Sequence, residues 1–130
     1  MKVIVKFYQE YFQPILEGSK TQTMRMAHKR LDVKVDDEVI AIFPEGQELV
    51  LRITDVGYKA FKSINDKDAE REGFNSAEEL KNVLREIYKD FNVEDYNRFY
   101  FYRFELIDDD NTVELSSNDE YTQDLLFGRL

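Results

Sequence analysis

The sequence predicts an α+β fold, in which several short strands and separate helices share one hydrophobic core. Strand-like patterns occur over Leu31–Asp36, Val39–Phe43, Leu49–Val56 and Arg98–Ile107, whereas Ser76 opens a segment with the apolar spacing of a helix. The chain has 130 residues, of which 42% are hydrophobic, so it suits one domain with one core. Its 10 Phe and 8 Tyr residues supply rings that can fill a small barrel.

The first thirty residues predict a strand, a helix and a second strand. Val3–Tyr8 is rich in β-branched and aromatic residues, as strands are. Apolar residues within Tyr11–Leu16 recur at helical spacing, and Gly18 ends that helix because glycine adopts a left-handed C-cap at little cost. Thr21–Arg25 then alternates as a strand does. One face of this strand would carry Thr21, Thr23 and Arg25, with Lys20 beside it.

The middle of the chain predicts three further strands. Leu31–Asp36 alternates between apolar and polar residues and indicates a half-buried strand. Val39–Phe43 is continuously apolar and indicates a buried strand, which the turn Pro44–Gln47 joins to Leu49–Val56 in a hairpin. Gly57 marks a bulge or bend of the kind that barrel corners require.

Two helices are predicted between residues 65 and 88. Asn65 or Asp66 caps the first, which ends at Gly73. Ser76 and Glu79 form the capping box of the second. The apolar stripe of this second helix comprises Leu80, Val83, Leu84, Ile87 and Tyr88.

The C-terminal part predicts one long strand and an extension. Arg98–Ile107 is apolar on both faces near its aromatic run and therefore indicates a central strand. Asp108–Asn111 is a turn, after which Thr112–Leu115 can pair back. We expect a domain over residues 1–115, followed by an extension over 116–130. Leu125, Leu126 and Phe127 would dock this extension or bind a partner.

Composition excludes several classes of site. The chain has no cysteine and 1 histidine, which excludes disulfides and disfavours a zinc centre of the kind used by nucleobase deaminases. We therefore expect no metal and no cofactor. The sequence has no apolar leader and no long apolar run, so we expect a cytoplasmic protein that does not enter a membrane.

The net charge of -9 is unevenly distributed. Residues 1–30 contain six cations and two acids, a net charge of +4, so the remainder carries -13. An acidic protein is a poor candidate for sequence-independent binding to long nucleic acids. The basic N-terminal part can still hold a small anionic ligand.

Lys20, Thr23 and Arg25 are the candidate chemical groups of this basic part. A threonine hydroxyl is a weak nucleophile and needs a base. A lysine supplies that base if burial or a second cation, here Arg25, lowers its pKa. The alternative is a solvated loop lysine beside an ordinary strand threonine.

The run Ile15-Leu16-x-Gly18-x-Lys20-Thr21-x-Thr23-x-Arg25 resembles the signature of ASCH domains. Further segments resemble the family in the same order, namely Val33–Val39, Leu51–Val56, Asp68–Phe74 with Ser76–Leu80, and Phe101–Leu106. The resemblance extends to about Leu106 and implies a small PUA-like β-barrel with a helical insert and one N-terminal helix. The family has glycine where this chain has Asp36, and aspartate tolerates a left-handed turn there.

The resemblance also implies an activity. Some ASCH proteins are amidohydrolases that remove the acetyl group of N4-acetylcytidine with a lysine, a threonine and a glutamate. Lys20 and Thr23 match the first two, and Glu72 matches the third because it precedes Gly73. The substrate would be a nucleoside-like small molecule, and the expected substrate-binding residues are Arg25, Thr21 and Ser19.

Two alternatives stay open at this point. The first is an RNA-binding module, with or without ribonuclease activity, whose partner is RNA, because the fold is similar to PUA RNA binders. The second is a non-catalytic regulatory interaction domain. Phe99–Tyr102 can form a stacking platform, although at strand spacing the core is favoured. His28 can stack on a base or have no role, and the latter is favoured.

Overall fold

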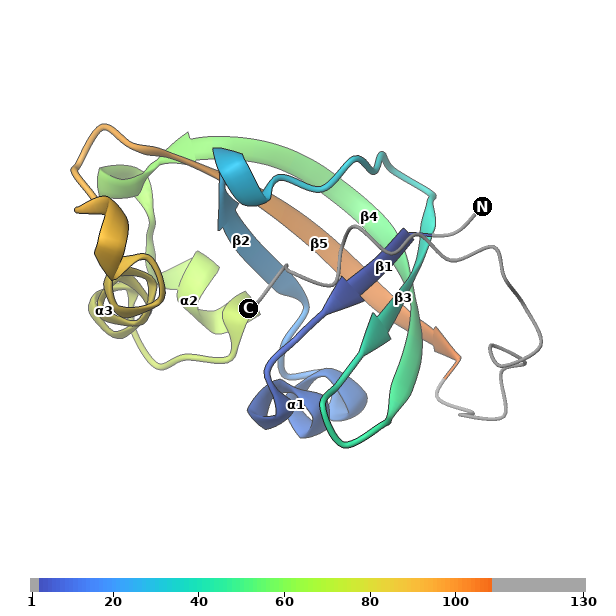
Figure 1. The fold of residues 1–130 in the computed structure, drawn as a ribbon. Helices are drawn as coiled ribbons and strands as arrows, with labels where there is room; N and C mark the ends of the chain where they lie inside the picture. Colours follow the sequence, from blue (N-terminus) through green and yellow to red (C-terminus); the bar gives the residue numbers. More distant parts are fainter. Residues whose placement is uncertain (1–2, 109–130) are drawn as a thin grey trace.

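The computed structural model describes residues 3–108, which form a curled half-barrel sheet with three α-helices (Figure 1). The strands are β1 (Val3–Lys6), β2 (Gln22–Met26), β3 (Glu38–Ile42), β4 (Glu48–Ala60) and β5 (Arg98–Asp108). The helices are α1 (Phe12–Glu17), α2 (Asp66–Glu72) and α3 (Ala77–Ile87). The predicted strand Thr112–Leu115 and the extension 116–130 lie outside the described residues. The α+β fold, with its N-terminal helix and helical insert, is confirmed.

The sheet has the order β1-β3-β4-β5-β2, so β1 and β2 are its two edges. β1 pairs with β3 in parallel, and every other pairing is antiparallel. The long central strands β4 and β5 change register between Ile53 and Asp55, which lets the sheet curl (Figure 1). A hydrogen bond of 3.3 Å from Arg25 Nη2 of β2 to the Lys6 carbonyl of β1 links the two edges.

The core lies on both sides of the sheet. The concave side is filled by residues such as Phe7, Leu51 and Tyr102, together with Ile15 of α1. On the other side, α2 and α3 pack against the end of the sheet formed by β2 and the start of β5 (Figure 1). The second cluster is built around Met24, Phe61, Ala69, Leu80, Leu84, Tyr88 and Phe99.

Two predictions about the sheet are wrong in detail. Leu31–Asp36 forms no strand, because its alternation has no ladder partner. The Leu31 N–H donates to the Tyr102 hydroxyl at 2.8 Å rather than to a backbone carbonyl, while Asp36 turns the chain with φ 79°. Gly57 lies within β4 rather than at a bulge: a Cβ there would come within 2.5 Å of Phe101 Cζ. A larger residue at position 57 would therefore force the Phe101 ring to move.

The helix boundaries follow the predicted caps. Asn65 caps α2 and exchanges hydrogen bonds with Asp68, and Gly73 ends the helix with φ 90°. Ser76 caps α3 by accepting the Glu79 N–H at 3.1 Å.

Candidate functional site

Lys20 and Glu72, which are 52 residues apart, form a buried ion pair. Gly18 ends α1 in the left-handed conformation, and the next two N–H groups, of Ser19 and Lys20, both donate to the Pro14 carbonyl. Thr21 N–H then donates to the Arg71 carbonyl at 2.6 Å, which joins the start of β2 to the end of α2. The turn formed by residues 18–21 therefore lies directly beside Glu72.

The pair is fully enclosed by protein. Lys20 Nζ lies 2.9 Å from Glu72 Oε1, and the exposed fractions of the two side chains are 3% and 5%. Nζ also donates to the Gln22 carbonyl at 3.0 Å and to the Glu72 carbonyl at 3.4 Å. The ammonium thus finds an acceptor for each of its protons, and it offsets both the carboxylate and the negative end of α2.

Burial raises the pKa of Glu72, although the adjacent Lys20 ammonium and the Gln22 amide oppose that rise. The protonated form of Glu72 is thereby brought closer to the physiological range than for a solvated glutamate. At 2.9 Å, the contact has the length of an ordinary charge-assisted hydrogen bond, and it joins the amine directly to the carboxyl group.

Lys20, Thr23 and Glu72 line one closed cavity. Its other walls are Tyr11, Phe74 and apolar side chains of α3. The cavity has a volume of about 10 Å³, which is close to the ~10–15 Å³ that one water requires. Within residues 3–108, the Thr23 hydroxyl makes no hydrogen bond to another side chain or to the backbone, so it is available to a molecule in the cavity.

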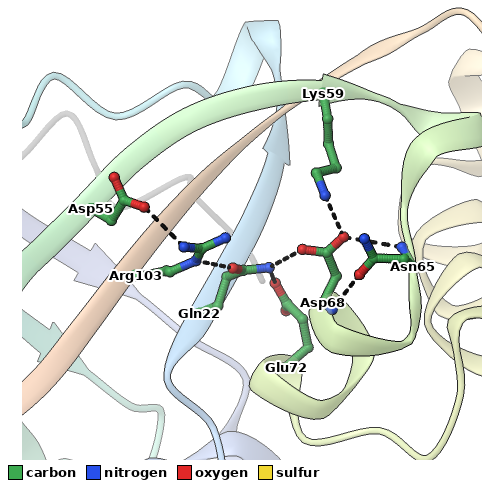
Figure 2. Close-up of polar contacts among 7 residues, drawn as sticks. All are labelled: Gln22, Asp55, Lys59, Asn65, Asp68, Glu72 and Arg103. Carbon is green, nitrogen blue, oxygen red and sulfur yellow. Dashed lines mark hydrogen bonds and ion pairs between the residues drawn. The ribbon is translucent and has the colours of Figure 1, made fainter.

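Gln22 connects this pair to a larger polar network (Figure 2). Its Nε2 donates at 3.3 Å both to Glu72 Oε2 and to Asp68 Oδ1, and its Oε1 accepts from Arg103 Nε at 2.9 Å. Since a guanidinium has only donors, Arg103 fixes the amide with its NH2 group toward the acids. The two oxygens of Glu72 are thereby assigned, one to Lys20 and one to Gln22.

The outer members of the network balance its charge. Lys59 Nζ lies 2.7 Å from Asp68 Oδ2, and Arg103 Nη1 lies 2.9 Å from Asp55 Oδ2. Burial opposes ionisation of Asp68, but hydrogen bonds from Lys59, Asn65 and Gln22 outweigh it and lower the pKa of Asp68. Asp68 is therefore an anion that adds to the negative potential at Glu72.

The sequence did not single out Gln22, Lys59, Asp68 and Arg103. Gln22 lies on the strand face opposite Thr23, and a polar residue on an edge strand usually faces solvent. Here it is fully buried. The one local signal was the Asn65–Asp68 capping pattern, which places Asp68 in the first turn of α2.

Arg25 is buried but lies apart from the cavity. Its guanidinium stacks at 5.8 Å on the Phe7 ring, and its Nε has no hydrogen-bond partner. No carboxylate among the described residues forms an ion pair with it, and burial lowers its pKa to about 10. The structure does not bring Arg25 into contact with Lys20, so its role as the cation that activates Lys20 finds no support here.

The other predicted site residues are dispersed. Ser19 and Thr21 line a surface hollow of about 580 Å³ beside Arg71, outside the closed cavity. The backbone N–H groups after Gly18 are used by Pro14 and are not free to stabilise an oxyanion. His28 stacks on Phe91 with the ring centroids 4.2 Å apart.

The aromatic run on β5 divides between core and surface. Phe99 and Tyr102 are buried, as the core interpretation predicts, whereas Tyr100 is half-buried.

Among residues 3–108, no cluster of three acidic or histidine side chains is arranged to hold a metal ion. No helix in this described part is long and apolar enough to cross a membrane.

The fold is similar to those of several solved structures. No family model and no curated protein matches the sequence. A DUF984 protein from Enterococcus faecalis V583 superimposes with a TM-score of 0.73 at 16% identity, covering 95% of this chain and 86% of that one. The hypothetical protein PH0355 has a TM-score of 0.64 at 28% identity, covering 82% of this chain and 100% of that one.

An ASCH domain from Lactobacillus crispatus JV V101 superimposes with a TM-score of 0.60 at 14% identity, covering 78% of this chain and 79% of that one. At such identity the likeness concerns the fold. The signature around Lys20 and the half-barrel with its helical insert agree with it. The chain is therefore a domain with the ASCH, PUA-like fold.

Proposed function

We propose that this domain is a metal-free amidohydrolase that removes the acyl group of N4-acetylcytidine or a related modified nucleoside. The observation that carries the proposal is the buried Lys20–Glu72 pair at 2.9 Å, which lines the same closed cavity as the free hydroxyl of Thr23. A buried pair of this kind is costly to maintain for stability alone, which favours a chemical role.

The proton transfers follow from the contacts. Glu72 takes a proton from Lys20 across their short hydrogen bond, which leaves a neutral amine. The amine takes the proton of Thr23, or of a water held by it, as that oxygen attacks the acyl carbonyl. When the C–N bond breaks, the cytosine amine receives the proton from Glu72 through Lys20. If an acyl-threonine forms, water releases it as the carboxylic acid by the same route.

Substrate entry requires the cavity to open. A nucleoside does not fit in about 10 Å³, but a groove of about 450 Å³ lies immediately outside, between the turn before α1 and helix α3. Tyr11, Val83 and Ile87 line both the groove and the cavity. Displacement of these three side chains would join the two spaces into one pocket of the size that small ligands occupy.

The direct test is incubation with N4-acetylcytidine, with cytidine measured by chromatography. We expect turnover by the natural chain and loss of at least about 100-fold in Lys20→Ala and in Thr23→Val, which removes the hydroxyl at constant shape. Lys34→Ala, at a lysine that is 85% exposed, is the matched control and should retain full activity. Absence of turnover at high protein concentration would refute the activity, and equal turnover in Lys20→Ala would refute the residue assignment.

A further inference from the structure

Gln22 holds the acidic side of the site in a fixed arrangement. It is fully buried on β2, and Figure 2 shows its amide between Arg103 of β5 and the two acids of α2. Both protons of Nε2 have acceptors, Glu72 Oε2 and Asp68 Oδ1, while Oε1 accepts from Arg103 Nε. Arg103 is itself held by Asp55 at 2.9 Å. The amide therefore cannot turn over without losing all three hydrogen bonds.

Asp68 lies one helical turn before Glu72 on α2, and its side chain is as completely buried as that of Gln22. Asp68 Oδ2 accepts hydrogen bonds from Lys59 Nζ at 2.7 Å and from the Asn65 N–H at 3.0 Å. Burial opposes the ionisation of Asp68, but these contacts outweigh burial and lower its pKa. Two carboxylates four residues apart on one helix repel each other, and burial strengthens the repulsion because little water screens it.

Side chains from several packed elements act on the charge of Glu72. Among residues 3–108, the titratable or charged side chains that face it are Lys20, Asp68, Arg25, Tyr11 and Tyr88. Burial raises the pKa of both tyrosines, so their hydroxyls stay neutral at neutral pH. Asp68 is therefore the anion of this set. The network thus supplies two opposing influences on Glu72, the Gln22 amide that stabilises the carboxylate and Asp68 that repels it.

We propose that Gln22 and Asp68 are positioning residues of the hydrolysis, which together set the pH range in which Glu72 accepts a proton from Lys20. The inference rests on the proposed function and extends it to two residues that do not line the cavity. Gln22 holds the Glu72 carboxylate with Oε2 occupied and with Oε1 against Lys20. Asp68 makes the same carboxylate a stronger base, because a nearby negative charge favours its protonation.

The two residues act in opposite directions, which purely structural residues would not do. Glu72 must be ionised to take the proton, so the acid limb of the pH profile of kcat/KM reports its titration. Gln22→Leu removes a hydrogen bond to the carboxylate and should move this limb to higher pH by at least about 0.5 pH unit. Asp68→Asn removes the repelling charge and should move the limb to lower pH by a similar amount. Loss of packing alone would lower activity in both variants without moving the limb.

Two measurements test the proposal, kcat/KM for N4-acetylcytidine over about pH 4–9 and a ¹³C NMR titration of the Glu72 carboxyl carbon without substrate. The Glu72 signal is identified by its absence from Glu72→Gln. Lys59→Met should also move both titrations to higher pH, because it removes the cation that offsets Asp68. The Lys59 side chain is 21% exposed, so this variant loses little packing. The matched control is Glu70→Gln, which removes an exposed acid from the same helix and should move neither titration.

The two readouts separate the positioning role from the proposed activity. Opposite movements of the acid limb and of the NMR titration in Gln22→Leu and Asp68→Asn support the proposal. If the natural chain shows no turnover but the NMR titrations still move apart, the hydrolysis is refuted, whereas the control of Glu72 by the two residues stands. A Glu72 titration that stays in place, moves in the same direction in both variants, or moves equally in Glu70→Gln overturns the proposal, whether or not the chain hydrolyses the substrate.

Discussion

Replacing Gln22 by leucine removes the centre of the polar network while preserving the size of the side chain. Leucine leaves Glu72 Oε2, Asp68 Oδ1 and Arg103 Nε each without one hydrogen bond, and it lies in a fully buried position. Hydrogen bonds to charged groups contribute about 1.5–3 kcal/mol each, but each of these three groups keeps an ion-pair partner. We therefore expect a loss of about 3 kcal/mol at neutral pH.

The loss should depend on pH in a defined direction. Burial raises the pKa of Glu72, so ionisation of this side chain destabilises the fold as the pH rises through that pKa. Removal of the Gln22 hydrogen bond raises the pKa of Glu72 further. The pKa of Asp68 is lowered, so it contributes stability above the unfolded value that is lost as the pH falls through the folded one. Because of both effects, the variant and the natural chain differ most in their free energy of unfolding near neutral pH and less in acid.

Urea unfolding followed by tyrosine fluorescence at about pH 7 and about pH 4.5 measures this difference. Gln13→Leu is the matched control, because Gln13 is an exposed glutamine of α1 that bonds to Glu17 alone, and it should change stability by less than about 0.5 kcal/mol. If Gln22→Leu is as stable as the natural chain, or if its loss is the same at both pH values, the role assigned to the network is wrong.

Two further substitutions test the packing around the site. Gly57→Ala should cost about 1–3 kcal/mol in urea unfolding, because its Cβ would meet Phe101 Cζ at 2.5 Å, and Phe101→Leu in the same chain should recover part of that loss. The side chain of Ile87 lines both the cavity and the outer groove, so Ile87→Ala should raise kcat/KM for N4-acetylcytidine several-fold. Lys89 lines the groove alone, so Lys89→Ala should leave kcat/KM unchanged. Lower activity in an Ile87→Ala variant that is correctly folded would exclude this entry route.

The sequence predicted best those features that depend on neighbours in the chain. Gly18 and Gly73 adopt the left-handed conformation, and Asn65 and Ser76 accept the expected N–H groups, because a cap involves only residues three or four apart. The strand predicted over Leu31–Asp36 is absent because alternation indicates an extended segment but does not show whether that segment has a pairing partner. Gln22 was missed for a related reason, since its partners lie 46, 50 and 81 residues away.

The position of the site follows from the way in which the sheet ends. β2 is an edge strand with β5 as its ladder partner, so its other side needs polar partners that a neighbouring strand would otherwise supply. The two buried cations of the described chain, Lys20 and Arg25, come from this segment, and each reaches a different element, Glu72 of α2 and the Lys6 carbonyl of β1.

Apolar side chains of similar size would fill the contacts of Lys20 and Glu72 beside β2 at lower electrostatic cost, because buried charges lose their hydration. The proposed chemical role of this lysine, carboxylate and hydroxyl would account for charges being kept there despite that cost. On this reasoning, Lys20→Met combined with Glu72→Leu should fold at least as stably as the natural chain while losing all hydrolysis, and a large loss of stability in that double variant would show that the pair serves the fold instead.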